Sequence, residues 1–289
     1  MNEPPFRRAD DNPRRRRFRK GIYLLPSLFT TLNMALGYYA LYHAISGSAA
    51  KPWHYDNAAR AIGFAIIFDG LDGKIARMTN TESDFGRELD SLADVITFGV
   101  APAILAWMWG FRILSPLNGS DLLARVVQLG AVSTFAFLIA GASRLARFNI
   151  QVNPQPSNPG RPGKKYFVGM PIPGGAGVIA AVVHFSDGNP ITTWWMGLIW
   201  VGLIFAVAFV MVSTWRFYSF KDIDFRSRHP FQLVVVIGVV IALIVSYSEY
   251  FLFLLALFYM LSGVFARLLY ILRRRGSPPP PPLEATPAP

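Results

Sequence analysis

The stretch from Asp69 to Asp94 reads DGLDGKIARMTNTESDFGRELDSLAD and lies where one long apolar segment ends and the next begins. Ionisable groups in or beside a membrane span are costly, and they usually mark a functional site. On a helix at 100° per residue, five positions fall within an arc of about 140°; they are Asp69, Asp72, Gly73, Ala76 and Arg77. On the following helix Gly86, Asp90 and Asp94 stack along one face. We therefore expect two carboxylate faces to confront each other across a helical hairpin whose polar turn, residues 79–84, lies at the membrane surface.

The rest of the chain has the composition of a membrane protein. Apolar residues make up 53% of it, charged residues only 16%, and its 289 residues leave room for about six to eight spans of roughly 20 residues. Apolar stretches occur at 22–45, 58–80, 88–111, 122–148, 172–186, 192–214, 230–247 and 250–272. Only the polar patch Tyr247–Glu249 separates the last two, so seven spans are the alternative to eight. The sequence predicts an all-α integral membrane protein with one helical domain.

The net charge of +11 follows from topology. Eight spans put both termini on one side, and nearly all basic residues fall on that side, leaving only Lys51, Arg60, Arg112 and Arg125 on the other. Under the positive-inside rule the basic side is cytoplasmic. Membrane topology, together with attraction to anionic lipid headgroups, then explains the net positive charge, and no nucleic-acid partner is expected. Residues 1–20 form a basic cytoplasmic arm, and the Pro-rich tail 276–289 is expected to be disordered.

Four neighbouring aspartates suggest a metal site. Carboxylates packed together repel one another unless cations intervene, and hard oxygen ligands suit Mg²⁺ or Mn²⁺. Two such ions match a diphosphate substrate, because they neutralise its oxygens and polarise the phosphorus under attack. Small Gly73 and Ala76 allow a ligand close to the backbone, and Arg77 offers a fork for phosphate. The alternatives are helix caps and interhelical polar contacts, or a transporter that binds cations along a pathway.

The full pattern D-x2-D-G-x2-A-R-x8-G-x3-D-x3-D fixes eight positions, and a chance match in a chain of this length is on the order of one in ten million. It resembles the signature of the CDP-alcohol phosphotransferase family at every position. The resemblance implies that Asp69, Asp72 and Asp90 bind two metal ions, and that Asp94 binds metal and serves as the base. It also implies a CDP-lipid site made by Gly73, Ala76, Arg77, Ser83 and Gly86.

The same resemblance implies an architecture. A six-helix catalytic core would cover residues 21–215, residues 216–275 would add about two transmembrane helices, and homodimers are common in the family. The expected location is the inner (cytoplasmic) membrane, with the active site facing the cytoplasm.

Three other segments bear on the acceptor alcohol. Pro26–Gly37, Ser143–Asn149 and Gly169–Pro173 together look like those of membrane-integral phosphatidylserine synthases, which implies CDP-diacylglycerol and L-serine as substrates. The guanidinium groups of Arg144 and Arg147 suit a serine carboxylate, and Asn149 suits its amine or hydroxyl. Topological anchoring is the other interpretation of these arginines, and glycerol 3-phosphate, inositol phosphate or choline are the alternative acceptors.

Two further observations complete the sequence predictions. Gly174 and Gly175 stand where the family pattern leads us to expect alanine. The four histidines, His43, His54, His184 and His229, show no ligand spacing, so packing or interface roles are favoured over catalysis.

Overall fold

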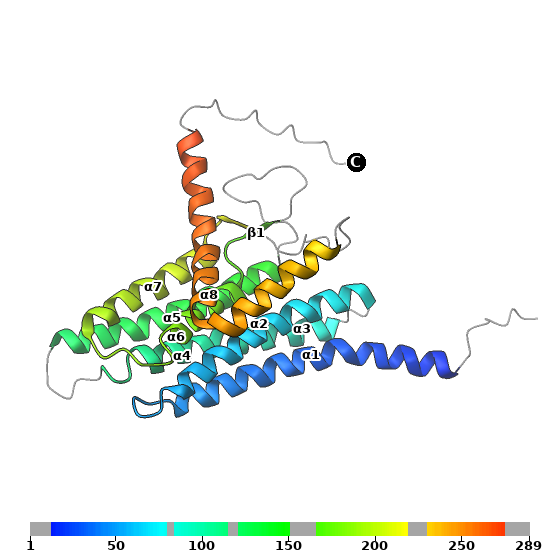
Figure 1. The fold of residues 1–289 in the computed structure, drawn as a ribbon, viewed down its shortest axis with the longest axis horizontal. Helices are drawn as coiled ribbons and strands as arrows, with labels where there is room; N and C mark the ends of the chain where they lie inside the picture. Colours follow the sequence, from blue (N-terminus) through cyan, green and yellow to red (C-terminus); the bar gives the residue numbers. More distant parts are fainter. Residues whose placement is uncertain (1–12, 80–83, 115–120, 151–165, 219–229, 275–289) are drawn as a thin grey trace, which may run out of the picture.

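Helices make up most of the chain in the computed structural model, which describes residues 13–79, 84–114, 121–150, 166–218 and 230–274 (Figure 1). The elements are α1 (Pro13–Ser46), α2 (Trp53–Thr79), α3 (Asp84–Asp94), the π-helix η1 (Val95–Val100), α4 (Ala101–Gly110), α5 (Asp121–Ile150), β1 (Tyr166–Val168), α6 (Ile172–Phe185), α7 (Trp194–Val212), β2 (Arg216–Tyr218) and α8 (Pro230–Arg274). Each predicted apolar stretch overlaps one of these helices, which confirms the all-α fold. The first three helical segments begin nine, five and four residues before the predicted starts at 22, 58 and 88. Residues 1–12 and the tail 276–289 lie outside the described residues.

The chain is a multi-pass membrane protein. Within the described residues, four helical segments are long and apolar enough to cross a bilayer: Phe85–Gly110, Asp121–Ile150, Trp194–Val212 and Gly238–Leu272. Helix α6 is apolar but has only 14 residues. Large apolar side chains such as Val132, Phe135 and Ile139 of α5 are exposed, with exposed fractions of 55%, 64% and 52%. A lipid environment would cover such a surface, which a soluble monomer rarely shows.

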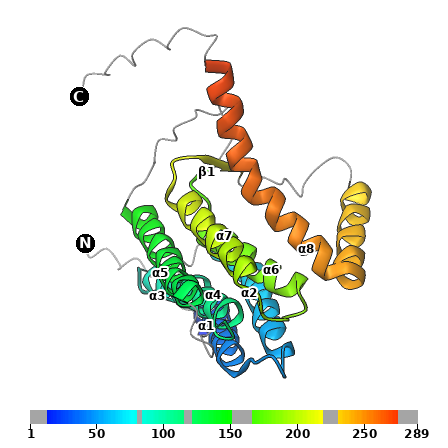
Figure 2. The same cartoon turned by 90° about the vertical axis from the view of Figure 1, so that its left-hand side faces the viewer.

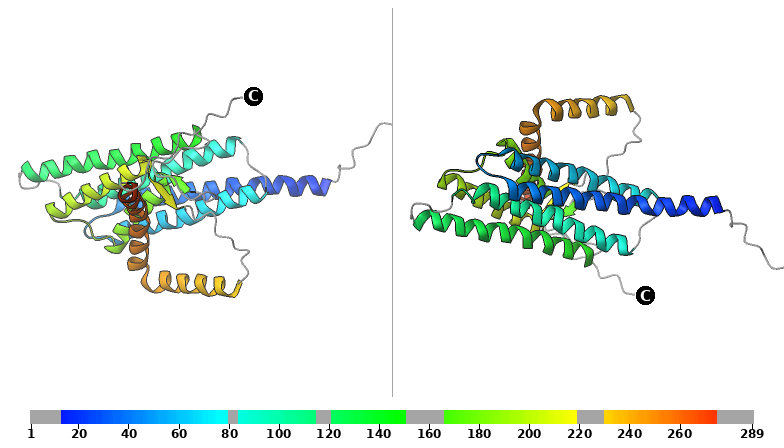
Figure 3. Two further views of the ribbon diagram at one scale, coloured as in Figure 1. Left: turned by 90° about the horizontal axis from the view of Figure 1, so that it is seen from above. Right: turned by 90° about the horizontal axis from the view of Figure 1, so that it is seen from below.

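Most residues of the buried core come from α2, α4, α6 and α7, and only Ala40 and Ala44 come from α1. This helix packs against α2 on one side and against the continuous helix α3–η1–α4 on the other, while α5 packs against α7 and α2 against α6 (Figures 2 and 3). Gly37 of α1 lies so close to Thr97 of η1 that a Cβ atom there would overlap the threonine hydroxyl. The Thr97 hydroxyl also donates a hydrogen bond to the Asn33 carbonyl at 3.1 Å. This close contact fixes η1 against the first helix.

The π-helical turn η1 is a feature that the sequence did not predict. It begins at Val95, directly after Asp94, and joins α3 to α4 without interrupting the helix from Asp84 to Gly110. Single π-turns inside α-helices are uncommon and occur frequently at functional sites, because the wider turn changes where the adjacent side chains point. Here the wider turn immediately follows Asp94, the last residue of α3.

A short two-stranded sheet joins the loops that follow α5 and α7. Strands β1 and β2 are antiparallel, with Tyr166 opposite Tyr218 and Val168 opposite Arg216. Gly169 follows β1 with φ of +76°, and its N–H donates to the Trp215 carbonyl at 2.7 Å. A Cβ atom at this position would lie 2.5 Å from the Met211 carbonyl oxygen, so only glycine fits. The sheet therefore ties the C-terminal end of α7 to the start of α6.

Helix α8 bends at Tyr247, which has φ of −143° and ψ of 44°. This bend lies in the polar patch Tyr247–Glu249 predicted to separate the last two apolar stretches. Beyond it the helix turns away from the direction of the bundle and runs across it, next to α6 and β2 (Figures 1 and 3).

A buried histidine holds this bend in place. His184 of α6 is 3% exposed, and its Nδ1 lies 2.5 Å from Oδ1 of Asp56 on α2. Because a carboxylate only accepts, the Nδ1–H donates. The Nε2 atom is 2.9 Å from the Ser248 hydroxyl, beside the bend, and Arg60 pairs with the other oxygen of Asp56 at 2.8 Å. The expected packing role of His184 thus joins three helices through one hydrogen-bonded chain.

Replacing His184 by alanine is expected to lower stability by about 2–3 kcal/mol, because it leaves a buried oxygen of Asp56 and the Ser248 hydroxyl without their partner. The measurement is the midpoint of thermal unfolding in detergent. Ser248→Ala removes only the outer contact and should lower the midpoint less. Equal midpoints for His184→Ala and the parent protein would contradict this role.

Candidate metal and substrate site

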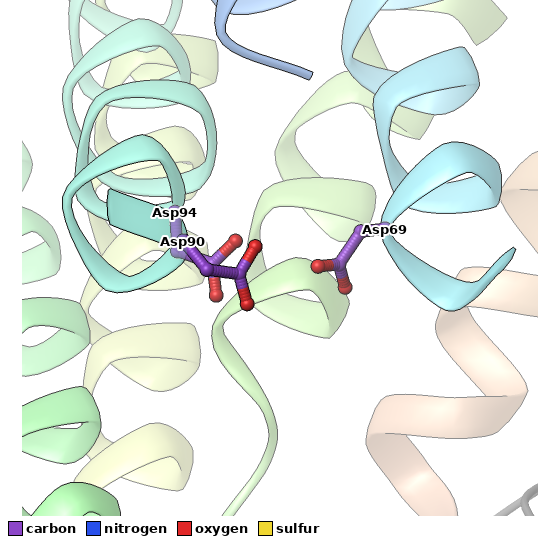
Figure 4. A group of neighbouring side chains, drawn as sticks. All are labelled: Asp69, Asp90 and Asp94. Carbon is purple, nitrogen blue, oxygen red and sulfur yellow. The ribbon is translucent and has the colours of Figure 1, made fainter. Parts of the chain in front are cut away.

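Three of the four predicted metal ligands meet in the structure. Asp69 projects from α2, and Asp90 and Asp94 project from successive turns of α3 toward it (Figure 4). One carboxylate oxygen from each residue lies within 4.8 Å of the other two. The carboxylate faces of α2 and α3 therefore lie opposite each other, as expected, for these three residues. Helix α1 packs against both α2 and α3 and holds them in place.

The chemistry of this cluster fits a divalent cation. All three aspartates are partly buried, and Oδ1 of Asp90 is buried with no hydrogen-bond partner in the described part of the chain. Partly buried carboxylates at this spacing repel one another, and a buried acceptor without a donor is destabilising. Oxygen ligands lie 2.0–2.1 Å from Mg²⁺, so opposite ligands of one ion are about 4.2 Å apart. A cluster within 4.8 Å thus needs little adjustment to hold an ion.

The remaining predicted residues of the CDP-lipid site are only partly described. Asp72, Gly73, Ala76 and Arg77 lie on the last turns of α2, where the helix is described but the side chains from Asp72 onward are not. Ser83 lies outside the described residues. Gly86 lies on α3, one turn before Asp90. Asp72 as fourth ligand and these contacts to the CDP-lipid stay predictions.

The three predicted acceptor residues follow one another on α5 but have different surroundings. Asn149 is exposed, and its Nδ2 donates to the Ser91 hydroxyl at 3.0 Å, which brings the end of α5 beside the carboxylate helix α3. Arg147 is also exposed. Arg144 instead points to the sheet, where its Nη2 donates to the Gly169 carbonyl at 3.4 Å and its guanidinium lies 6.0 Å from the centre of the Phe167 ring.

Two polar residues near these helices are not among the site residues that the sequence predicts. Ser91 links α3 to Asn149, and Asn33 of α1 is fully buried with no hydrogen-bond partner for either atom of its amide in the described part of the chain. A buried amide without a hydrogen-bond partner is unusual. It can be recognised only from the structure, because the sequence does not show that Asn33 is buried. In the sequence, the segment Pro26–Gly37, which contains Asn33, is informative only through its resemblance to the family.

The three histidines that the structure describes lie outside the carboxylate cluster. His54 is the second residue of α2, and Asp69 follows 15 residues later, about 22 Å along the helix axis. His54 and His43 contact each other through their Nδ1 atoms at 2.9 Å. His184 pairs with Asp56, near the same end of α2, and His229 lies outside the described residues.

Comparison with known proteins identifies related chains. The family model for CDP-alcohol phosphatidyltransferase matches residues 23–208. A Helicobacter pylori protein named CDP-diacylglycerol–serine O-phosphatidyltransferase is 34% identical over 214 residues, which cover 72% of this chain and 77% of that protein. Proteins of the same name from Saccharomyces cerevisiae and Methanocaldococcus jannaschii are 35% identical over 145 residues and 42% identical over 120 residues. These two matches cover 50% and 42% of this chain, and 48% and 47% of the respective relatives.

Proposed function

Because the chain belongs to the CDP-alcohol phosphatidyltransferase family, we propose that it transfers the phosphatidyl group of CDP-diacylglycerol to L-serine, forming phosphatidylserine and CMP. The observation that carries the proposal is the carboxylate cluster of Asp69, Asp90 and Asp94 within the family's matched region. The name of the Helicobacter pylori relative supports serine as the acceptor.

The carboxylates are proposed to bind the ions that this chemistry needs. Two divalent cations, Mg²⁺ or Mn²⁺, held by Asp69, Asp72, Asp90 and Asp94, would neutralise the diphosphate and make its lipid-side phosphorus more electrophilic. The glycines and Ala76 of the signature leave room for the CDP part, and Arg77 and Ser83 bind its phosphates. Gly86, one turn before Asp90, keeps the same face of α3 open.

The proposed reaction is a direct in-line transfer. Asp94 accepts the proton of the serine hydroxyl, and the serine oxygen forms a bond to the lipid-side phosphorus. The bond from that phosphorus to the bridging oxygen breaks, and CMP leaves with that oxygen and its electron pair. Asp94 then releases the proton to solvent, so no covalent enzyme intermediate is required.

The acceptor side of the site is assigned to the end of α5. Arg144 and Arg147 are proposed to bind the serine carboxylate, and Asn149 its amine or hydroxyl. The hydrogen bond from Asn149 to Ser91, the residue after Asp90, supports this arrangement because it places the end of α5 beside the helix that bears the base.

Replacing Arg147 by alanine should raise the KM for serine by about tenfold or more, since a hydrogen bond to a charged group contributes about 1.5–3 kcal/mol. The KM for CDP-diacylglycerol should change far less. Steady-state kinetics with each substrate varied in turn would measure both. Arg125→Ala, at the other end of α5, is the matched control. Equal effects on both substrates would indicate an arginine that only anchors the helix.

The orientation and assembly follow from the same proposal. Membrane lipids surround the bundle, and the excess of basic residues on the side of the termini supports an active site on the cytoplasmic face of the inner membrane. A homodimer is proposed from the resemblance to the family.

Product analysis tests the function. Purified protein with CDP-diacylglycerol, serine and Mn²⁺ should yield phosphatidylserine and CMP in equal amounts, measured by mass spectrometry. Formation of phosphatidic acid instead would mean that water, and not serine, accepts the phosphatidyl group.

A further inference from the structure

Arg144 is a partly buried cation for which the described residues provide no counter-ion. Its Nη2 contacts a carbonyl, the Phe167 ring faces its guanidinium, and its Nε is buried without a hydrogen-bond partner in the described part of the chain. None of these groups is a carboxylate. Burying part of an unpaired charge is unfavourable, so an anionic group that binds to Arg144 would complete its surroundings.

One aromatic residue near Arg144 comes from the C-terminal helix. Tyr259 of α8 lies against the same sheet as Arg144: its ring faces Phe217, and Phe217 pairs across the strands with Phe167, whose ring faces the Arg144 guanidinium. The Tyr259 ring is 5.7 Å from that of Phe217 on β2, and its Cε1 would lie 2.9 Å from a Cβ atom at position 174. Gly174 is one of the two glycines that stand where alanine was expected, and the structure gives a reason: a methyl group there would press on Tyr259.

A second glycine sets the approach of α8 to the sheet. Gly263, one turn after Tyr259, faces Phe217 so closely that a Cβ atom would overlap the ring. Met260 between them is 8% exposed. This side of α8 therefore packs directly on the sheet and α6, which fixes the position of Tyr259. Both β2 and α8 lie beyond residue 208, where the match to the family model ends.

We propose that Tyr259 is a positioning residue for the acceptor, which orients the Arg144 guanidinium to receive the carboxylate of serine. The inference rests on the proposed function and deepens it. With this role for Tyr259, the C-terminal helix α8 contributes to the selection of the acceptor alcohol. The phenol oxygen of Tyr259 orients the Arg144 guanidinium, and the Tyr259 ring packs on Phe217.

The test separates the hydroxyl from the ring. Tyr259→Phe keeps the ring, so its packing against Phe217 is retained. We expect the KM for serine to rise about tenfold, which corresponds to the loss of one weak interaction with a charged group. The kcat and the KM for CDP-diacylglycerol should stay within about twofold of the parent values. Tyr250→Phe, on the same helix and facing Phe185, is the matched control and should behave like the parent.

L-Serine methyl ester supplies the second readout, because it keeps the hydroxyl and amine but lacks the carboxylate charge. With this acceptor, Tyr259→Phe and the parent should have kcat/KM values within about twofold of each other. Equal losses for serine and its ester, or an unchanged KM for serine in the active variant, would overturn the role of Tyr259 alone. A parent protein that releases no CMP with serine would instead overturn the proposed function, and this inference with it.

Discussion

Asp94→Asn is expected to abolish phosphatidyl transfer, with kcat reduced by at least about a thousandfold, because an amide cannot accept the proton of the serine hydroxyl. Binding of CDP-diacylglycerol should be largely retained, since Asp69 and Asp90 still face the site. The two measurements are CMP release under saturating substrates and equilibrium binding of labelled CDP-diacylglycerol.

Glu88→Gln is the matched control for Asp94→Asn. Glu88 lies on the same helix, is exposed, and also loses one negative charge when replaced. It should retain parental turnover. An Asp94→Asn variant that turned over normally would remove Asp94 from the role of base.

Asp90→Asn should weaken metal binding more than it changes the chemical step. Its buried Oδ1 has no hydrogen-bond partner among the described residues, and removal of its charge takes away one hard ligand. The Mn²⁺ concentration for half-maximal activity should rise by about ten- to a hundredfold. Direct titration of Mn²⁺ by electron paramagnetic resonance should show the same shift.

The two aspartate variants are distinguished by rescue. Excess Mn²⁺ should restore a large part of the activity of Asp90→Asn, because the ligand set is weakened but the base remains. It should not restore Asp94→Asn. If high Mn²⁺ rescued both variants equally, Asp94 would be only a ligand, and the proton would have to go elsewhere.

Spacing along single helices accounts for what could be predicted. Asp90 and Asp94 are one turn apart, so any helix through them places both carboxylates on one face, and this face of α3 lies toward Asp69 of α2. The bend at Tyr247 was predictable for a related reason, since the polar patch there is the only interruption of a long apolar stretch.

Features that depend on long-range contacts could not be predicted in this way. The π-turn η1 has no local signal in VITFGV, and its position against α1 depends on Gly37 being near Thr97. Strands β1 and β2 have three residues each and exist because they pair across more than 40 residues of chain. The contacts of Arg144 depend on that sheet, because its guanidinium lies against Gly169 and Phe167.

The contacts of the histidines also depend on residues that are distant in the sequence. The four histidines have no ligand spacing in the sequence, and those that the structure describes are used for packing between helices. The partner of His184 on α2 is 128 positions away, and its partner on α8 is 64 positions away. No spacing rule connects residues so distant, although each pair is in direct contact in the fold.

The proposal that L-serine is the acceptor is tested most directly by supplying a set of acceptor alcohols one at a time. Purified protein is supplied with CDP-diacylglycerol, Mn²⁺ or Mg²⁺, and one labelled alcohol at a time: L-serine, glycerol 3-phosphate, inositol phosphate or choline. We predict that CMP is released with serine alone, with one labelled lipid formed for each CMP. Release with glycerol 3-phosphate, inositol phosphate or choline, and none with serine, would contradict the account.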